Sequence, residues 1–386
     1  MTSRQLPESA SVVIIGGGVV GVSAAYELAK AGVTDVVLLD KGPLGSGSTC
    51  KAAGGVRAQF SDPLNIALGA RGLETFEHFE QIFGQDIDLQ QVGYLFLLSS
   101  DEHVAAFESN VAVQRDLGVN SSMISVAEAA QLSPLIDTDG LLAAAYSPRD
   151  GHCTPESVVL GYAMAARRAG ATLVPNCAAT GVDIQDGRIS AVHTAGGSIR
   201  ADAVICAAGP WSQQIGEWVG VDLPVTPLRR QILITEPMPG LAPNTPFTID
   251  FDTSFYFHGE GPGLLIGMSD PDEQPGFKLG RDDAWLARLG EVMEHRTPSL
   301  AGVGIASGWA GLYEMTPDHN ALIGRSERVE GFLYATGFSG HGFLMGPAVG
   351  EVLRDLYLDI PPFVDVSSLR AERFESADIR PELNVV

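Results

Sequence analysis

The sequence predicts a mixed α/β and α+β fold, in which a Rossmann-like unit of parallel strands and helices alternates along the chain with a mainly antiparallel sheet. Three observations predict it. An apolar run at residues 12–15 is followed by a glycine turn and by a helix-forming segment over 19–31. A second apolar run at 36–39 completes a strand–helix–strand unit. Residues 225–270 instead contain short β-rich runs separated by proline and glycine, which is typical of antiparallel strands.

Chain length predicts two interleaved domains. The chain has 386 residues, more than one ordinary core holds. Strand and helix signals of the first type return at 155–175, at 204–207 and again near the end. We therefore assign the Rossmann-like domain to residues 1–88, 151–224 and 306–386, and a substrate domain built on the antiparallel sheet to residues 89–150 and 225–305.

Hydrophobic spacing and turn residues predict the remaining elements. Helices are expected at 62–83, as two segments within 101–135, at 282–295 and at 346–358. Strands are expected at 92–98, as a meander over 181–200 and at 332–336, followed by a glycine-rich loop over 337–345.

Composition excludes several classes of partner. The 24 basic and 47 acidic side chains leave a formal charge of −23, which repels nucleic acids and anionic membranes. The four cysteines are widely separated and no HExxH pattern occurs, so we expect no metal site and a reducing, cytoplasmic location. The apolar stretch 11–29 is a poor signal peptide, because Arg4 and Glu8 precede it without a net positive charge and three glycines interrupt it.

The turn after the first apolar run has the pattern Gly16-x-Gly18-x-x-Gly21. In a dinucleotide site the first glycine permits the turn, the second lets backbone approach a pyrophosphate, and the third lets helix pack on sheet. Val19 and Val20 open the helix, whose free N–H groups and positive dipole end favour phosphate.

Asp40 ends the second apolar run, nineteen residues after Gly21. A carboxylate at this place accepts hydrogen bonds from both ribose hydroxyls and repels the 2′-phosphate of NADP. Lys41 follows directly and is expected to contact the same ligand. Together with the flanking strand and helix, these residues predict a dinucleotide site.

Three further stretches extend this pattern: GSGST at 45–49 with AAGGVR at 52–57, AVICAAGPWS at 203–212, and TGFSGHGFLMGPAVGE at 336–351. From 12 to 358 the chain resembles the superfamily of FAD-dependent amine oxidoreductases that includes D-amino acid oxidase, glycine oxidase and sarcosine oxidase. It is most similar to sarcosine oxidase β-subunit-like proteins. The resemblance implies a Rossmann-like FAD-binding domain, with FAD rather than NAD as the cofactor.

The resemblance also implies cofactor contacts outside the first unit, through small residues that let the isoalloxazine pass close to backbone, and through the helix that follows residues 337–345. These expected contacts are Ser48, Thr49, Ala53, Gly54, Gly55, Val56, Ala179, Ala208, Gly209, Trp211, Gly340, His341, Gly342, Phe343, Leu344 and Met345.

Four residues are the candidates for the catalytic pocket. Arg57 matches the arginine that binds the substrate carboxylate in the family, and its guanidinium fork suits bidentate contact. Tyr256 and His258 lie on the strand expected to cover the pocket. His341 is expected to orient the loop rather than to act as a base.

The chain also departs from the family at informative places. Gly311 stands where monomeric sarcosine oxidases attach the flavin through cysteine, so non-covalent FAD is expected. Leu265 replaces the lysine that assists oxygen reduction in those enzymes. Leu344 and Ser269 replace a carboxylate-holding lysine and a pocket histidine, which leaves Arg57 as the remaining anchor.

The favoured reaction is oxidation of a C–N bond in a secondary amine or N-substituted amino acid, by hydride transfer to flavin N5, to give an imine that hydrolyses. One alternative is the flavoprotein subunit of an amino acid dehydrogenase of the proline or D-amino acid type, which passes electrons to a protein partner. The other is a non-enzymatic flavoprotein acting in the assembly of another complex. The identity and chirality of the amine stay open.

Overall fold

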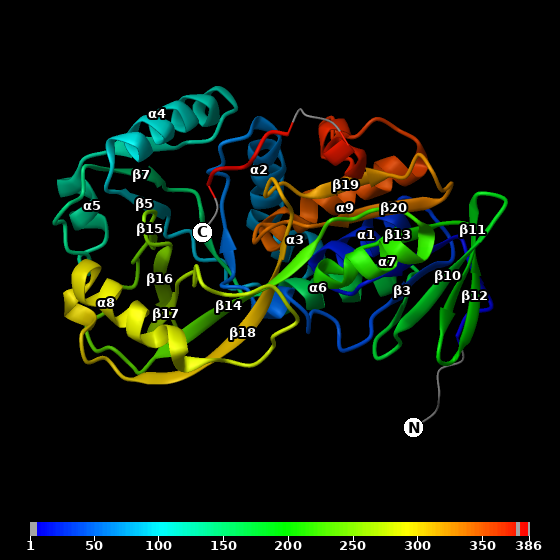
Figure 1. The fold of residues 1–386 in the computed structure, drawn as a ribbon, viewed down its shortest axis with the longest axis horizontal. Helices are drawn as coiled ribbons and strands as arrows, with labels where there is room; N and C mark the ends of the chain where they lie inside the picture. The colour runs from blue at the N-terminus through cyan, green and yellow to red at the C-terminus, as the bar shows by residue number, and fades with distance from the viewer. Residues whose placement is uncertain (1–5, 376–378, 385–386) are drawn as a thin grey trace.

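The computed structural model describes residues 6–375 and 379–384, which form two adjoining lobes (Figure 1). One lobe contains a six-stranded sheet with the order β19-β20-β13-β2-β3-β9. Its strands are parallel except for β19 at one edge. They are β2 (Val12–Ile15), β3 (Val36–Leu39), β9 (Thr172–Val174), β13 (Val204–Cys206), β19 (Leu322–Arg325) and β20 (Phe332–Thr336).

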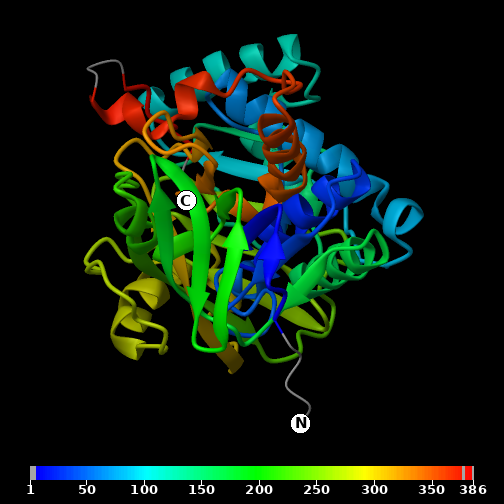
Figure 2. The ribbon, with the colours of Figure 1, turned by 90° about the vertical axis from the view of Figure 1, so that its right-hand side faces the viewer.

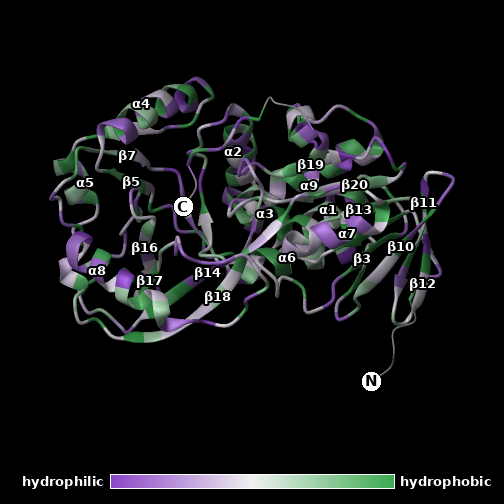
Figure 3. Ribbon diagram, in the orientation of Figure 1, coloured by the Kyte–Doolittle hydropathy of each residue, from purple (hydrophilic) through white to green (hydrophobic). Residues whose placement is uncertain are grey.

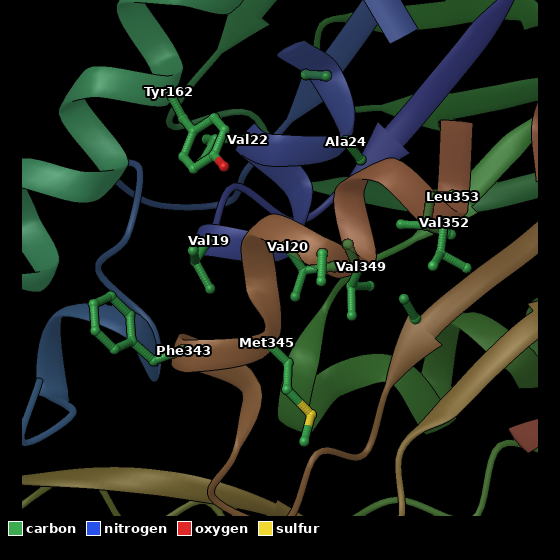
Figure 4. Close-up of a cluster of buried hydrophobic side chains, with 14 of the residues drawn as sticks. Val19, Val20, Val22, Ala24, Tyr162, Phe343, Met345, Val349, Val352 and Leu353 are labelled. Carbon is green, nitrogen blue, oxygen red and sulfur yellow. The ribbon is translucent and has the colours of Figure 1, made fainter. Parts of the chain in front are cut away.

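Helices pack closely beside this sheet. α1 (Val19–Lys30) contacts both α6 (Pro155–Arg168) and α9 (Gly342–Leu358). The hydroxyl of Ser23 in α1 donates to the carbonyl oxygen of Gly346 in α9 over 2.7 Å. Figure 4 shows apolar side chains of both helices in one buried cluster, including Val20 and Val349. This packing fixes the start of α1 against the start of α9.

A small sheet lies at the outer end of the same lobe (Figure 2). Its order is β1-β12-β11-β10, and its strands are β1 (Ser9–Ala10), β10 (Ala179–Gln185), β11 (Arg188–Thr194) and β12 (Gly197–Ala201). The last three are the predicted meander. α7 (Ser212–Val219) packs against β10.

The second lobe is built on an eight-stranded sheet with the order β18-β14-β17-β16-β15-β5-β7-β6. All neighbouring pairs are antiparallel except β15 with β5. The strands are β5 (Tyr94–Leu98), β6 (Ser122–Ile124), β7 (Ala143–Ser147), β14 (Thr226–Thr235), β15 (Phe247–Asp250), β16 (Phe255–Glu260), β17 (Gly263–Gly267) and β18 (Ile305–Met315). The outer helices are α4 (Asp101–Asp116), α5 (Val126–Leu132) and α8 (Leu286–Arg296), and α4 and α8 carry hydrophilic residues in Figure 3.

The fold class is confirmed, but three elements differ from the sequence prediction. The single helix expected over 62–83 is two helices, α2 (Pro63–Glu77) and α3 (Phe79–Phe83), because His78 between them has non-helical dihedrals of φ −106° and ψ 11°. Strand β6 separates the two helices predicted within 101–135. α9 begins at Gly342 rather than at 346, so the glycine loop is shorter than predicted.

The five-segment division of the chain stays a proposal, and sheet pairing moves its last boundary. β18 pairs with β14 along its whole length, from Ile305 to Met315. It therefore belongs to the eight-stranded sheet, and the change of lobe follows Met315 instead of residue 305. None of the helices in the described ranges has both the length and the apolar character that a membrane span requires.

Candidate active site

A cavity of about 480 Å³ lies between the lobes and takes its walls from both. One end is formed by the glycine turn after β2, the end of β3 and the start of α1. The other end is formed by the inward face of the eight-stranded sheet and by the loop 51–57 that crosses it. We refer to these as the cofactor end and the substrate end.

The glycine turn at the cofactor end has no room for side chains. Gly16 has φ +115°, and a Cβ there would lie 2.1 Å from the carbonyl oxygen of Ala207. A Cβ at Gly21 would lie 1.9 Å from the carbonyl oxygen of Gly16, so Gly21 serves helix packing and does not line the cavity. Gly18 precedes the first turn of α1 and has no side chain to cap it, so the N–H groups of this turn other than that of Val19, which donates to Thr49, are available to an anion.

Asp40 and Lys41 lie at the same end. The Asp40 carboxylate accepts hydrogen bonds from the backbone N–H groups of Gly17 and Gly42, each over 2.7 Å. Burial raises the pKa of Asp40, against the effect of those two amides. The Lys41 ammonium lies 3.1 Å from the centroid of the Trp211 ring, so both side chains cover one stretch of cavity wall.

The hydroxyl groups of Ser48 and Thr49 brace the protein's own backbone. Ser48 donates to the carbonyl oxygen of Leu312 over 2.6 Å, and Thr49 accepts from the N–H of Val19 over 3.1 Å. These bonds favour a role in supporting the loop over the direct cofactor contact that the resemblance implies for both residues.

Most of the predicted site residues lie on the cavity wall. They are Gly16, Gly18, Val19, Val20, Asp40, Lys41, Ser48, Thr49, Ala53, Gly54, Gly55, Arg57, Ala179, Ala208, Gly209, Trp211, Tyr256, Gly340, His341, Gly342, Phe343 and Leu344. Four others lie off the wall: Gly21, Val56, His258 and Met345. Val56 is fully buried in β4 (Gly55–Val56), which pairs with β8 (Gly151–His152), and Met345 packs in the apolar core.

His258 was predicted to lie in the catalytic pocket, but it lies off the cavity wall. Its Nε2 lies 2.9 Å from the carbonyl oxygen of Ala53, and its Nδ1 lies 2.8 Å from that of Gly259. Burial lowers its pKa to about 4, so the neutral ring donates one N–H to one of these oxygens. His258 therefore supports the loop that carries Ala53.

Arg57 and His341 meet at the substrate end. Arg57 is 3% exposed, and its Nη2 lies 3.3 Å from Nε2 of His341. Burial, with a contribution from the Arg57 charge, lowers the pKa of His341 to about 3, so the imidazole is neutral near pH 7. This agrees with an orienting role for His341.

Sequence reasoning missed the described C-terminal segment 379–384, which carries no recognisable motif. Glu382 is 1% exposed and accepts hydrogen bonds from Ser61 and Asn65. The carbonyl oxygen of Asn384 accepts from Nη2 of Arg57 over 2.7 Å. Figure 1 shows this segment entering between the lobes. It thereby fixes the orientation of Arg57.

The wall residues that were missed include three polar ones, Tyr94, Arg230 and Tyr313. Each lies on a strand of the eight-stranded sheet, and an inward-facing polar residue in an apolar strand is the signal that could have found it. The hydroxyl groups of Tyr94, Tyr256 and Tyr313 have no hydrogen bond to any residue that the structure describes. They are available to a ligand.

Leu265 lies on a second cavity, which shares Ala52 and Ala53 with the main one. The apolar side chain of Leu265 is 3% exposed. Trp309 also lines this second cavity. The residue that replaces the family's lysine thus stands behind the loop and not in the substrate end.

The class of the protein follows from this arrangement. A parallel sheet ending in a glycine turn too crowded for side chains, an open helix N-terminus and a carboxylate after the second strand fit a dinucleotide that runs toward a second domain. The donor set suits the pyrophosphate and ribose of FAD, and the sheet-lined end leaves space for a small molecule. The fold and the site define a dinucleotide-binding oxidoreductase of two lobes.

Comparison with known proteins names the family. Residues 11–356 match the family described as DAO, FAD dependent oxidoreductase, so the chain belongs to it and FAD is its cofactor. Mitochondrial sarcosine dehydrogenase of Mus musculus is 30% identical over 96% of this chain and 42% of that protein. Mitochondrial dimethylglycine dehydrogenase of Rattus norvegicus is 31% identical over 95% of this chain and 45% of that protein. The chain thus spans less than half the length of these curated relatives.

Solved structures agree with this placement. The crystal structure of L-proline dehydrogenase from P. horikoshii superposes with a TM-score of 0.91 at 34% identity, covering 97% of this chain and 100% of that chain. Glycine oxidase from Geobacillus kaustophilus gives a TM-score of 0.84 at 25% identity, covering 95% of this chain and 99% of that chain.

Proposed function

We propose that the protein oxidises the C–N bond of a secondary amine or N-substituted amino acid to an imine, which water hydrolyses. The observation that carries the proposal is the substrate end of the cavity, where cationic and hydroxyl groups surround an apolar space. Bound FAD supplies the acceptor for the hydride that leaves the substrate carbon. The names of the relatives, which include sarcosine, dimethylglycine and proline, support substrates of this class.

The protein's own groups have limited work to do in such a reaction. Phe247 and Ile249 line the substrate end and exclude water from the reacting carbon. Arginine and tyrosine side chains hold the polar part of the substrate and so orient its C–N bond. An amine that binds in its neutral form needs no protein base, which fits the neutral state of His341.

A second candidate function concerns the electron acceptor. The apolar Leu265 offers no positive charge to favour electron transfer to oxygen, which supports a dehydrogenase that passes electrons to a protein partner. Noncovalent attachment of FAD, cytoplasmic location and the absence of nucleic acid or membrane partners stay predictions.

Anaerobic mixing with sarcosine, dimethylglycine, L-proline and glycine tests the reaction. We expect at least one of them to bleach the flavin absorbance, and the matching hydroxy acids to leave it unchanged. Failure of all the amines would contradict the proposal and favour a non-enzymatic role in assembly. Admission of air to the bleached protein then separates oxidase from dehydrogenase, since slow recovery of colour with fast reduction of an added dye favours the latter.

A further inference from the structure

Arg230 lies in the substrate end of the main cavity. It belongs to β14 and pairs with Gly311 of β18. Its guanidinium carbon is 5.1 Å from the centroid of the Tyr313 ring. Tyr256 and Phe247 line the same end of the cavity. The side chain of Arg230 therefore faces the space that a substrate would fill.

Most hydrogen-bond donors of Arg230 are unused. Its Nη1 donates to the carbonyl oxygen of Arg229 over 3.3 Å. Its Nε is buried without a partner, and its Nη2 has no bond to any residue within the described ranges. Nε and Nη2 form the edge of a guanidinium that matches two carboxylate oxygens. Because a buried N–H without an acceptor is costly, this edge fits an acceptor that arrives with a ligand.

Other interior arginines of the same lobe are neutralised by carboxylates. Arg229 bonds to Glu273 over 2.6 Å, and Arg296 bonds to Asp250 over 2.8 Å. Arg230 has no carboxylate within ion-pair distance in the part of the chain that the structure describes, although acidic residues outnumber basic ones by 47 to 24. Its charge is thus left available to the cavity.

Arg57 differs from Arg230 in this respect. Its Nη1 donates to the carbonyl oxygen of Gln59, and its Nη2 donates to the carbonyl oxygen of Asn384 and faces Nε2 of His341. A substrate carboxylate could take two adjacent donors of Arg57 only by displacing the C-terminal segment or His341.

We propose that Arg230, and not Arg57, binds the substrate carboxylate through its Nε–Nη2 edge, while Arg57 positions the loop 51–57 through its bond to Asn384. The inference deepens the proposed function, on which it rests, by naming the residue that selects amino acids over neutral amines. It departs from the role that family resemblance implies for Arg57. The hydroxyl of Tyr313, beside the guanidinium, is available to the same carboxylate.

Equilibrium binding of compounds that cannot be oxidised at nitrogen tests this assignment. The probes are methoxyacetate and tetrahydrofuran-2-carboxylate, each paired with its neutral amide, titrated calorimetrically into the FAD-loaded protein. We expect the wild type to prefer the acids. Arg230→Gln should lose roughly 10- to 100-fold in affinity for the acids, the scale of a lost charged hydrogen-bond pair, with little change for the amides. Arg230→Lys keeps the charge without the fork and should lose less.

Two matched variants complete the test. Arg288→Gln removes the same charge from an exposed place in the same lobe and should leave all four affinities unchanged. Arg57→Gln should weaken acids and amides alike, because it disturbs the loop. An Arg230→Gln protein that still prefers acids, a selective loss in Arg57→Gln, or a wild type without preference would each overturn the assignment. Neither probe is oxidised, so the wild type should prefer the acids even if the proposed reaction is wrong. If this inference is wrong, Arg230→Gln should also keep that preference for the acids.

Discussion

The two ends of the cavity are built in different ways. At the cofactor end, the functional groups are mostly backbone, held within residues 16–21 and 40–42 by hydrogen bonds and steric crowding. At the substrate end, they are side chains from separate strands, including Tyr94, Arg230 and Tyr313, joined by the C-terminal segment. The first end depends on the absence of side chains, and the second depends on which side chains are present.

This difference determines how each end responds to change. The backbone site tolerates almost no substitution at Gly16 or Gly21, because a Cβ at either position would meet backbone atoms that cannot move aside. A site made of side chains on strands can exchange one residue without altering the sheet, so its specificity can change while the cofactor end stays constant. Four substitutions test this comparison, in descending order of expected effect.

Gly16→Ala should abolish FAD binding. Its Cβ would meet the carbonyl oxygen of Ala207 at 2.1 Å, in a left-handed conformation, at a cost of about 3 kcal/mol or more. Gly32→Ala is the matched control, since Gly32 also has positive φ but no heavy atom within 4 Å of the Cβ position. It should cost only about 1 kcal/mol. FAD content and thermal unfolding are measured for both variants. Equal losses in Gly16→Ala and Gly32→Ala would refute the role of crowding around Gly16.

Glu314→Gln should change how stability depends on pH. Burial raises the pKa of Glu314 to about 7, against hydrogen bonds from Gly337 and Thr336. Between its unfolded pKa and pH 7 the unfolded chain loses this proton while the folded protein keeps it, so wild-type stability falls as pH rises. The variant should lack this decrease, which is on the order of 3 kcal/mol.

The measurement is thermal unfolding of the FAD-loaded proteins between pH 4 and pH 8. Glu102→Gln, which removes an exposed carboxylate on α4, is the control and should follow the wild-type curve. Parallel curves for wild type and Glu314→Gln would show that folding does not raise the pKa of Glu314.

Asp40→Asn should weaken FAD binding by about 1–2 kcal/mol, the scale of a charge-assisted hydrogen bond. The Asp40 carboxylate holds the backbone N–H groups of Gly17 and Gly42, and an amide keeps only one acceptor for them. Asp35→Asn, at the other end of β3, is the control. An unchanged FAD dissociation constant would mean that Asp40 does not serve the cofactor.

Leu265→Lys should speed reoxidation of the reduced protein in air by only a few-fold, because position 265 lies behind the loop 51–57 and a cation there would favour electron transfer to oxygen from across that loop. Burial of the new ammonium lowers its pKa and limits the gain. Leu265→Met keeps the side chain apolar and is the control. Stopped-flow mixing of photoreduced protein with air measures the rates. Rapid reoxidation of the wild type, without substrate, would show that another residue activates oxygen.

The sequence by itself determined the cofactor end. The glycine spacing, the apolar runs and Asp40 lie within thirty residues, so local pattern predicts their geometry. The fold class followed because strand periodicity and interleaved helices are local signals as well. Family motifs indicated the loop 51–57 and a helix after the second glycine-rich segment. The structure begins this helix, α9, at Gly342, four residues earlier than predicted.

Tertiary structure alone decided the substrate end. The sequence does not distinguish the roles of Arg57 and Arg230. In the folded protein Gln59, His341 and the distant Asn384 occupy the donors of Arg57, whereas most donors of Arg230 stay free. His258 has the strand position of a pocket residue, yet the carbonyl oxygen of Ala53 takes its ring nitrogen. Such roles depend on contacts between residues hundreds of positions apart, which spacing along the chain does not encode because they form only when the two lobes and the C-terminal segment pack together.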